Sequence, residues 1–149
     1  MIGDGIRRYG PAQLPDFAFA PNGAIKPLEE YMGMRGLVGH PTPVWDTYLF
    51  AGGEHVMRYN TVSTIYGYGD YELTNSGCYI ENRSCSAQIT TVWQLAAGFW
   101  HDLYKGNSGD IRIGLEDSIT RREAFSDILG DAPHSHENIL MTSFRYYPF

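Results

Sequence analysis

The chain has 149 residues, of which 19% are charged and 14% aromatic, and it carries a formal net charge of −6. This acidic balance argues against nucleic-acid binding, which needs a basic face to neutralise phosphates. No run of about 18 apolar residues is present, which excludes a transmembrane helix, and many rings and glycines with few charges favour β-structure.

The sequence of residues 1–28 shows no pattern that predicts a long helix or strand. Its opening decapeptide, MIGDGIRRYG, has no apolar stretch after its charges, so we do not expect it to act as a secretory signal peptide. The segment QLPDFAFA (13–20) alternates over a short distance, but Pro15 disfavours a strand inside a sheet. We therefore expect a loop region over residues 1–28 and strands over residues 30–149.

Five later segments alternate between unlike faces with a period of two, which is typical of strands. They are residues 30–39, 44–58, 91–105, 110–125 and 137–149. In the fourth, Ile111, Ile113 and Leu115 fall on one face and Arg112 and Glu116 on the other. A helix would scatter these residues around its circumference. The third and fourth segments also exceed the five or six residues of an ordinary strand and approach or pass the nine to eleven that cross a bilayer.

The connections between these segments alternate in length. Short ones rich in Gly, Asn and Pro follow the first and third segments, and longer ones follow the second and fourth. Outer-membrane barrels have this arrangement, with short turns in the periplasm and long loops outside. The sequence therefore predicts an all-β fold, an antiparallel meander of five to six long strands that forms the C-terminal part of a transmembrane β-barrel.

The expected strand count implies an incomplete ring. Single-chain bacterial barrels have an even number of strands and at least eight. We therefore expect residues 1–149 to form a single, partial barrel domain. Either missing N-terminal strands or another chain would complete it.

The two cysteines, Cys78 and Cys85, lie among Asn, Ser and Gly in the stretch GCYIENRSCS. Neither a His nor a second Cys pair stands at a zinc-site spacing. Two free thiols in a reducing compartment are the alternative. A place in an external loop favours a disulfide, which requires an oxidising compartment.

Charged side chains on the polar faces of the expected strands are the candidate functional residues. They are Glu54, Asp102, Arg112, Glu116 and Arg122. In an open barrel these groups would set ion or solute selectivity, and in a closed one they would form a salt-bridged plug. Asp117 falls on the expected lipid face, where a charge is costly at the midplane and tolerable near an interface.

Two further groups have residue types that suit a metal site or a catalytic triad. They are Asp131, His134, His136 and Glu137, and Asp102, His101 and Ser108. The first group lies in an expected external loop, where solvated side chains are the simpler interpretation. The second lacks a nucleophile-elbow pattern. We therefore expect no metal, no cofactor and no enzymatic activity, with a barrel-embedded hydrolase as the alternative.

The final stretch, MTSFRYYPF, ends on an aromatic residue with another two positions earlier. This pattern resembles the last strand of Gram-negative outer-membrane β-barrel proteins. The barrel-assembly machinery recognises that strand. The resemblance implies that Tyr147 and Phe149 form an insertion signal, although Ser143 and Arg145 depart from the alternation. Together with GHPTPVWDTYLFAGGE and GFWHDLYKG, the stretch also resembles the C-terminal part of large, poorly characterised proteobacterial outer-membrane proteins, from about residue 36 onward.

This resemblance implies a location in the bacterial outer membrane, contact with its lipid, and a porin-like passive transport or structural role. It implies no catalytic residue. The alternative is a soluble secreted β-sandwich or a lipocalin-like protein that binds a small ligand with its aromatic side chains.

Overall fold

Strands are the only regular elements in the part of the chain that the computed structural model describes, which comprises residues 2–3, 14–60, 67–70 and 72–148. The long strands are β4 (Glu30–Thr42), β5 (Trp45–Val56), β6 (Ile89–Gly106), β7 (Gly109–Ala124) and β8 (His134–Tyr147). The short ones are β1 (Ile2–Gly3), β2 (Phe17–Phe19) and β3 (Ile25–Pro27). Over the described ranges, no helix is long and apolar enough to span a membrane.

The long strands coincide with the five alternating segments, so the prediction of an all-β chain with long antiparallel strands is confirmed. β6 and β7 have 18 and 16 residues, and their ends lie within two residues of the expected bounds. Valine, isoleucine, threonine and aromatic side chains, which suit a pleated surface, dominate these segments. The period-two pattern was therefore sufficient to locate them.

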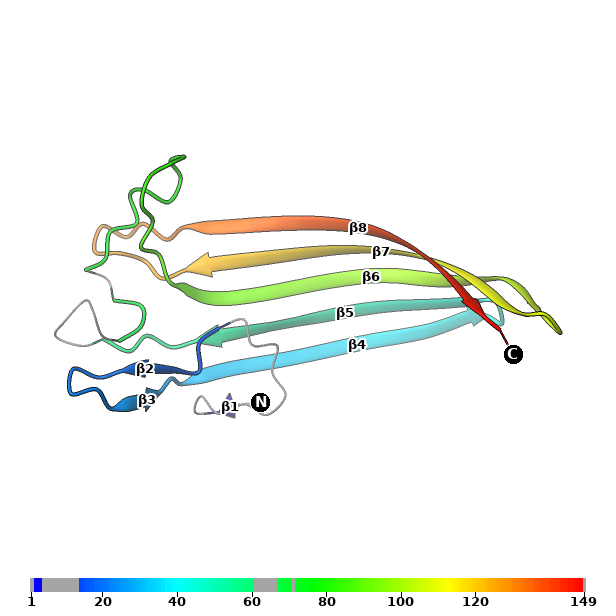
Figure 1. The fold of residues 1–149 in the computed structure, drawn as a ribbon, viewed down its shortest axis with the longest axis horizontal. Helices are drawn as coiled ribbons and strands as arrows, with labels where there is room; N and C mark the ends of the chain where they lie inside the picture. The colour runs from blue at the N-terminus through cyan, green and yellow to red at the C-terminus, as the bar shows by residue number, and fades with distance from the viewer. Residues whose placement is uncertain (1, 4–13, 61–66, 71, 149) are drawn as a thin grey trace. The chain divides into compact units, whose positions relative to one another are not determined.

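The long strands and β1 form one sheet in the order β1-β4-β5-β6-β7-β8, in which long strands that follow one another in sequence lie side by side (Figure 1). At one end, Ile2 of β1 pairs with Tyr31 of β4. At the other end β8 is an edge strand, and its side chains are exposed throughout. The described residues thus form an open sheet, without closure into a barrel. An exposed edge offers unpaired backbone groups to another strand.

The connections also follow the expected alternation. Residues 43–44 and 107–108 connect β4 to β5 and β6 to β7, whereas residues 57–88 and 125–133 connect β5 to β6 and β7 to β8. Gly109, directly after the second short turn, has a φ of 108°, which side chains rarely adopt. A Cβ atom there would also collide with the carbonyl oxygen of Tyr147. Only glycine fits where β7 begins.

The chain divides into two compact units, and each long strand contributes residues to both. Unit 1 comprises Met1–Gly33, Gly53–Trp93 and Arg121–Ser135, and unit 2 comprises Met34–Gly52, Gln94–Thr120 and His136–Phe149. Both long connections belong to unit 1 and both short ones to unit 2.

Unit 1 has a small hydrophobic core. Its buried members are Leu14, Ala18, Leu28, Val56 and Val92. The antiparallel pair β2–β3 places Ala18 of β2 in this core, and Leu28 follows directly after β3, with its backbone N–H bonded to the Asp16 carbonyl oxygen. This hairpin lies in the segment for which the sequence predicts a loop, because three-residue strands are too short to show a period. Of the weak candidate strand over residues 13–20, only β2 is found, and Gln13 lies outside the described residues.

Candidate functional site

Side-chain contacts in unit 2 show which strand positions share a face of the sheet. Arg112 of β7 forms ion pairs with Asp46 of β5 and Asp102 of β6. The even-numbered positions of these strands therefore lie together, and we call their side the polar face. On the opposite side, the ring centroids of Trp45 and Phe99 lie 5.0 Å apart. We call this side the apolar face.

Contacts from β4 and β8 extend the polar face to both sides. His40 Nδ1 lies 2.6 Å from Asp46 Oδ1, so even-numbered positions of β4 belong to it. The Arg145 guanidinium lies 4.0 Å from the Trp100 ring centroid, so β8 contributes its odd-numbered positions. The even-numbered positions of β8 therefore belong to the apolar face. The sequence alone does not decide which side of β8 faces which way.

An ion-pair cluster joins three strands on the polar face. The Arg112 guanidinium bridges the carboxylates of Asp46 and Asp102, a geometry that its fork of N–H donors allows. The side chains of Asp46, Arg112 and Asp102 are 34%, 24% and 16% exposed, respectively. Molecules in contact with this face can thus reach the cluster.

Three aromatic side chains of the polar face lie over glycines of neighbouring strands. They are Phe50 over Gly36, Tyr48 over Gly98 and Trp100 over Gly114, and we call these three rings the aromatic strip. A Cβ atom at Gly114 would lie 2.8 Å from the Trp100 indole, closer than real Cβ contacts. The Tyr48 hydroxyl also donates to Glu116 Oε2 at 2.6 Å. The glycines thus make room for rings that rest against the sheet.

Unit 2 contains three of the five candidate lumen charges. Asp102 and Arg112 form an ion pair, and Glu116 accepts the hydrogen bond from a tyrosine hydroxyl. Glu54 and Arg122 belong to unit 1, where Glu54 is buried and Arg122 is exposed.

Three residues of the polar face were missed as site residues by sequence reasoning: Asp46, Tyr48 and Arg145. A signal existed for Asp46 and Tyr48, because both alternate in step with Glu54 in the same segment. Arg145 gave none, because the odd-numbered positions of its strand mix the polar Ser143 with the apolar Ile139 and Met141. Its role depends on contact with another strand.

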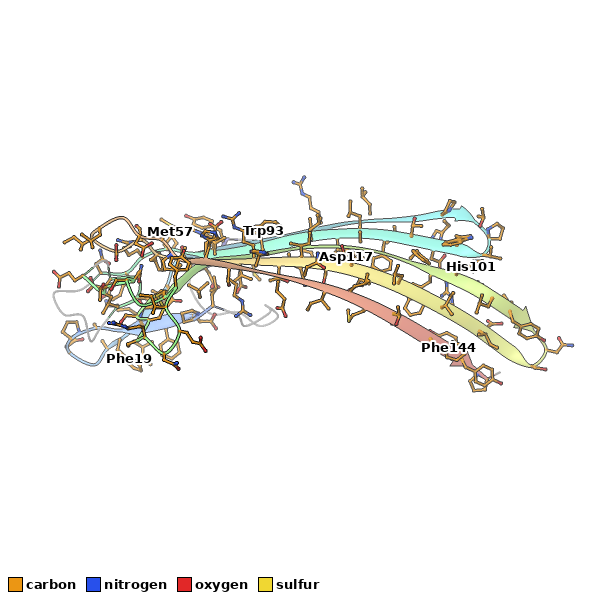
Figure 2. All side chains as sticks on the ribbon, turned by 90° about the horizontal axis from the view of Figure 1, so that it is seen from above. Phe19, Met57, Trp93, His101, Asp117 and Phe144 are labelled. Carbon is orange, nitrogen blue, oxygen red and sulfur yellow. A yellow bond between two sulfur atoms is a disulfide. The ribbon has the colours of Figure 1, made fainter. Side chains whose placement is uncertain are left out.

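The apolar face of unit 2 exposes many large apolar side chains. They are Leu37, Leu49, Leu95, Leu103, Ile113, Ile119, Leu140 and Phe144. Phe144 of β8 is 68% exposed and is labelled in Figure 2. Contiguous exposed apolar patches mark surfaces that contact a protein or a membrane. Asp117 shares the parity of this face in β7, two positions from Ile119, near the end of the strand part that belongs to unit 2.

The residues of the expected insertion signal are only partly described. Tyr147 ends β8, and its hydroxyl accepts a hydrogen bond from Arg145 Nη1 at 3.3 Å. Phe149 lies outside the described residues.

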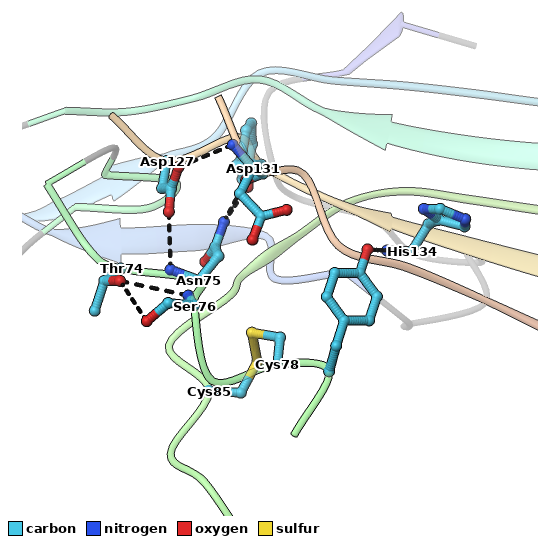
Figure 3. Close-up of a disulfide and its surroundings, with 10 residues drawn as sticks. Thr74, Asn75, Ser76, Cys78, Cys85, Asp127, Asp131 and His134 are labelled. Carbon is cyan, nitrogen blue, oxygen red and sulfur yellow. Dashed lines mark hydrogen bonds between the residues drawn. A yellow bond between two sulfur atoms is a disulfide. The ribbon is translucent and has the colours of Figure 1, made fainter. Parts of the chain in front are cut away.

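The long connections of unit 1 are held by a disulfide and by a buried polar cluster (Figure 3). Cys78 and Cys85 are bonded to each other, as the sequence predicts. Asn75, which is 2% exposed, donates its backbone N–H to Asp127 Oδ2 at 3.0 Å and its side-chain amide to the Phe125 and Asp131 carbonyl oxygens. One connection is thereby fixed to the other.

This cluster should loosen in acid. Backbone N–H groups of Asn75, Asp131 and Leu129 hydrogen-bond the Asp127 carboxylate and lower its pKa below the ordinary value. A lowered pKa stabilises the cluster at pH values above the ordinary pKa of about 4, and this stabilisation is lost as pH falls through the lower, folded pKa. We expect hydrogen exchange of the Asn75 and Leu129 amides, corrected for intrinsic rates, to accelerate below about pH 4.

Asp127→Asn provides the control for this prediction. The amide keeps one acceptor but cannot carry the charge, so exchange should be faster at pH 7 and nearly independent of pH. Equal protection of the wild type at pH 3 and pH 7 would contradict the assignment.

The structure does not assemble the triad types. His101 and Asp102 alternate to opposite faces, where His101 stacks on Trp45 and Asp102 pairs with Arg112. Ser108 lies in the short turn after β6, where its carbonyl oxygen accepts a hydrogen bond from the hydroxyl of Tyr146 in β8. Among the described side chains, no group of three or more His, Cys, Asp or Glu residues is placed to hold a metal ion.

The arrangement is therefore a two-faced sheet, with the ion-pair cluster and the aromatic strip on one side and most of the exposed leucine and isoleucine side chains on the other. The division is incomplete, because Met34 and Val38 are exposed on the polar face, and Arg35 and Asp117 have the parity of the apolar face. Comparison with known proteins adds no family to this description. No protein-family model matches the chain, and neither the curated proteins nor the solved structures gave a match.

Proposed function

We propose that this chain forms part of the wall of a transmembrane β-barrel in a bacterial outer membrane, with a porin-like passive transport or structural role. The observation that carries the proposal is the contrast between the two faces of unit 2. Leu95, Ile113 and Phe144 are exposed on one face, while Arg112 is paired on the other. A barrel wall has this division, because lipid accepts apolar side chains and a lumen accepts charged ones.

Strand length supports the same proposal. The strand parts that belong to unit 2 have between eight and thirteen residues, around the nine to eleven that a tilted strand needs to cross the hydrocarbon. Trp45 and Tyr146 lie beside the short turns on the apolar face. Amphipathic rings prefer the headgroup level of a membrane, where one end is apolar and the other wet.

The open edges support the expected partners. Backbone groups within hydrocarbon must be paired inside the protein, so an edge such as β8 needs another strand. Missing N-terminal strands or another chain would supply it. The barrel-assembly machinery and outer-membrane lipid are the remaining partners that we propose.

Membrane fractionation tests this proposal. The chain is expressed behind a signal peptide in a Gram-negative host, and its recovery in the outer membrane is compared with that of a version lacking Phe149. We expect the wild type in the outer-membrane fraction and a large loss of recovery on deletion. A periplasmic product that is indifferent to the deletion would favour a soluble ligand-binding β-protein instead.

A further inference from the structure

Two rings of the aromatic strip, Phe50 and Tyr48, are at least partly exposed to solvent on the polar face. Phe50 is 37% exposed and Tyr48 is partly exposed, with ring centroids 5.5 Å apart and planes inclined by 41°. The glycines beneath these rings leave no side chains to lift them from the sheet. The bond from the Tyr48 hydroxyl to Glu116 further fixes one of them. Both rings are thus held in place without a binding partner.

The third ring differs from the other two. The Arg145 guanidinium lies over Trp100, 4.0 Å from the ring centroid. This contact is close enough for a cation–π interaction. One face of Trp100 is therefore already occupied, and stacking on the strip is limited to Phe50 and Tyr48.

Polar groups suited to hydroxyls lie next to these rings. Asp46 stands two positions before Tyr48 in β5, on the same face, and it shares Arg112 with Asp102. Carboxylate and guanidinium groups present paired acceptors and donors in fixed directions. By parity, Asp110 and Glu137 also belong to this face in unit 2, so carboxylates outnumber the guanidinium groups of Arg112 and Arg145 there. Such a surface offers directed hydrogen bonds to neutral molecules and disfavours anionic ones.

We propose that Phe50 and Tyr48 bind neutral sugars, with a pyranose ring stacked on the aromatic surface and its hydroxyls bonded to Asp46 and Arg112. The C–H groups of a pyranose are weakly positive and suit the negative face of an aromatic ring. Ligand sites combine such apolar contact with a few directed polar groups. The inference rests on the proposed function, because it takes the polar face as the lumen, and it names the solute class of that lumen.

Saturation-transfer NMR on the full chain in phosphocholine micelles tests this site with maltose as the probe. We expect magnetisation to pass from aromatic protons of the protein to the ring protons of maltose, and none to sorbitol, an acyclic polyol. Phe50→Ala should weaken maltose binding about tenfold, since removing a stacking partner has effects of this order. Phe50→Leu should weaken it similarly, because it keeps apolar volume but has no ring.

Phe144→Ala is the matched control, because it removes an exposed phenyl ring from the apolar face. Maltose binding should survive this change. Absence of transfer to maltose, or equal loss in Phe50→Ala and Phe144→Ala, would overturn the inference. Membrane recovery is measured separately: a chain that binds maltose through Phe50 but stays out of the outer membrane contradicts the proposed function alone.

Discussion

Leu140→Lys is expected to abolish recovery of the chain from the outer membrane, whereas Met141→Lys should leave recovery nearly unchanged. The two residues are neighbours near the middle of the β8 part that belongs to unit 2, and both are exposed, at 66% and 46%. By parity, Leu140 belongs to the apolar face and Met141 to the polar face. A lysine facing lipid near the midplane costs about 2–4 kcal/mol, whereas lumen positions tolerate charge.

This pair separates a membrane wall from a soluble sheet. In water, a lysine at either exposed position changes stability little, so both variants would behave alike. Recovery is measured by outer-membrane fractionation and by heat-modified mobility in gels without boiling. Equal recovery of the two variants would contradict the assignment of the faces.

Gly98→Val is the second change with a large expected effect. Its Cβ atom would overlap the Tyr48 hydroxyl and lie 2.8 Å from the Leu115 carbonyl oxygen, a backbone atom that cannot turn aside. Displacing Tyr48 also breaks its hydrogen bond to Glu116. We expect the free energy of unfolding to fall by about 1–3 kcal/mol, as is usual for overpacking. Urea titration of the folded chain in lipid vesicles measures the fall.

Gly33→Val is the control for this substitution. Nothing lies within 4 Å of the position that its Cβ would take, and valine suits a strand. Stability should be unchanged or slightly raised. A fall equal to that of Gly98→Val would show that the loss of any strand glycine, rather than the packing of Tyr48, is responsible.

Strand positions could be predicted from the sequence, because alternation is a local property of each segment. Apolar and polar residues alternate strictly over most of β7, and the predicted bounds of this strand agree with the observed ones to within one residue. The β2–β3 hairpin could not be predicted, because its buried residues pack into a core that is formed with distant segments. Local patterns contain no information about such contacts.

The candidate site shows the same limit. Asp102, Arg112 and Glu116 could be assigned to a polar face from parity alone. Their partners could not, because the Arg112 cluster depends on the alignment of three strands and Arg145 reaches Trp100 from a fourth. The glycines beneath the rings are visible in the sequence. Which ring covers which glycine depends on the register between strands.

Spin labels placed one at a time over residues 111–120 of β7, in the full chain reconstituted into vesicles, test the central claim most directly. Accessibility to oxygen, which partitions into lipid, is compared with accessibility to a water-soluble nickel complex. We expect accessibility to alternate with a period of two, with oxygen favoured at Ile111, Ile113, Leu115 and Ile119 and the nickel complex favoured at the positions between them. Nickel access at all of these positions would contradict a lipid-facing surface.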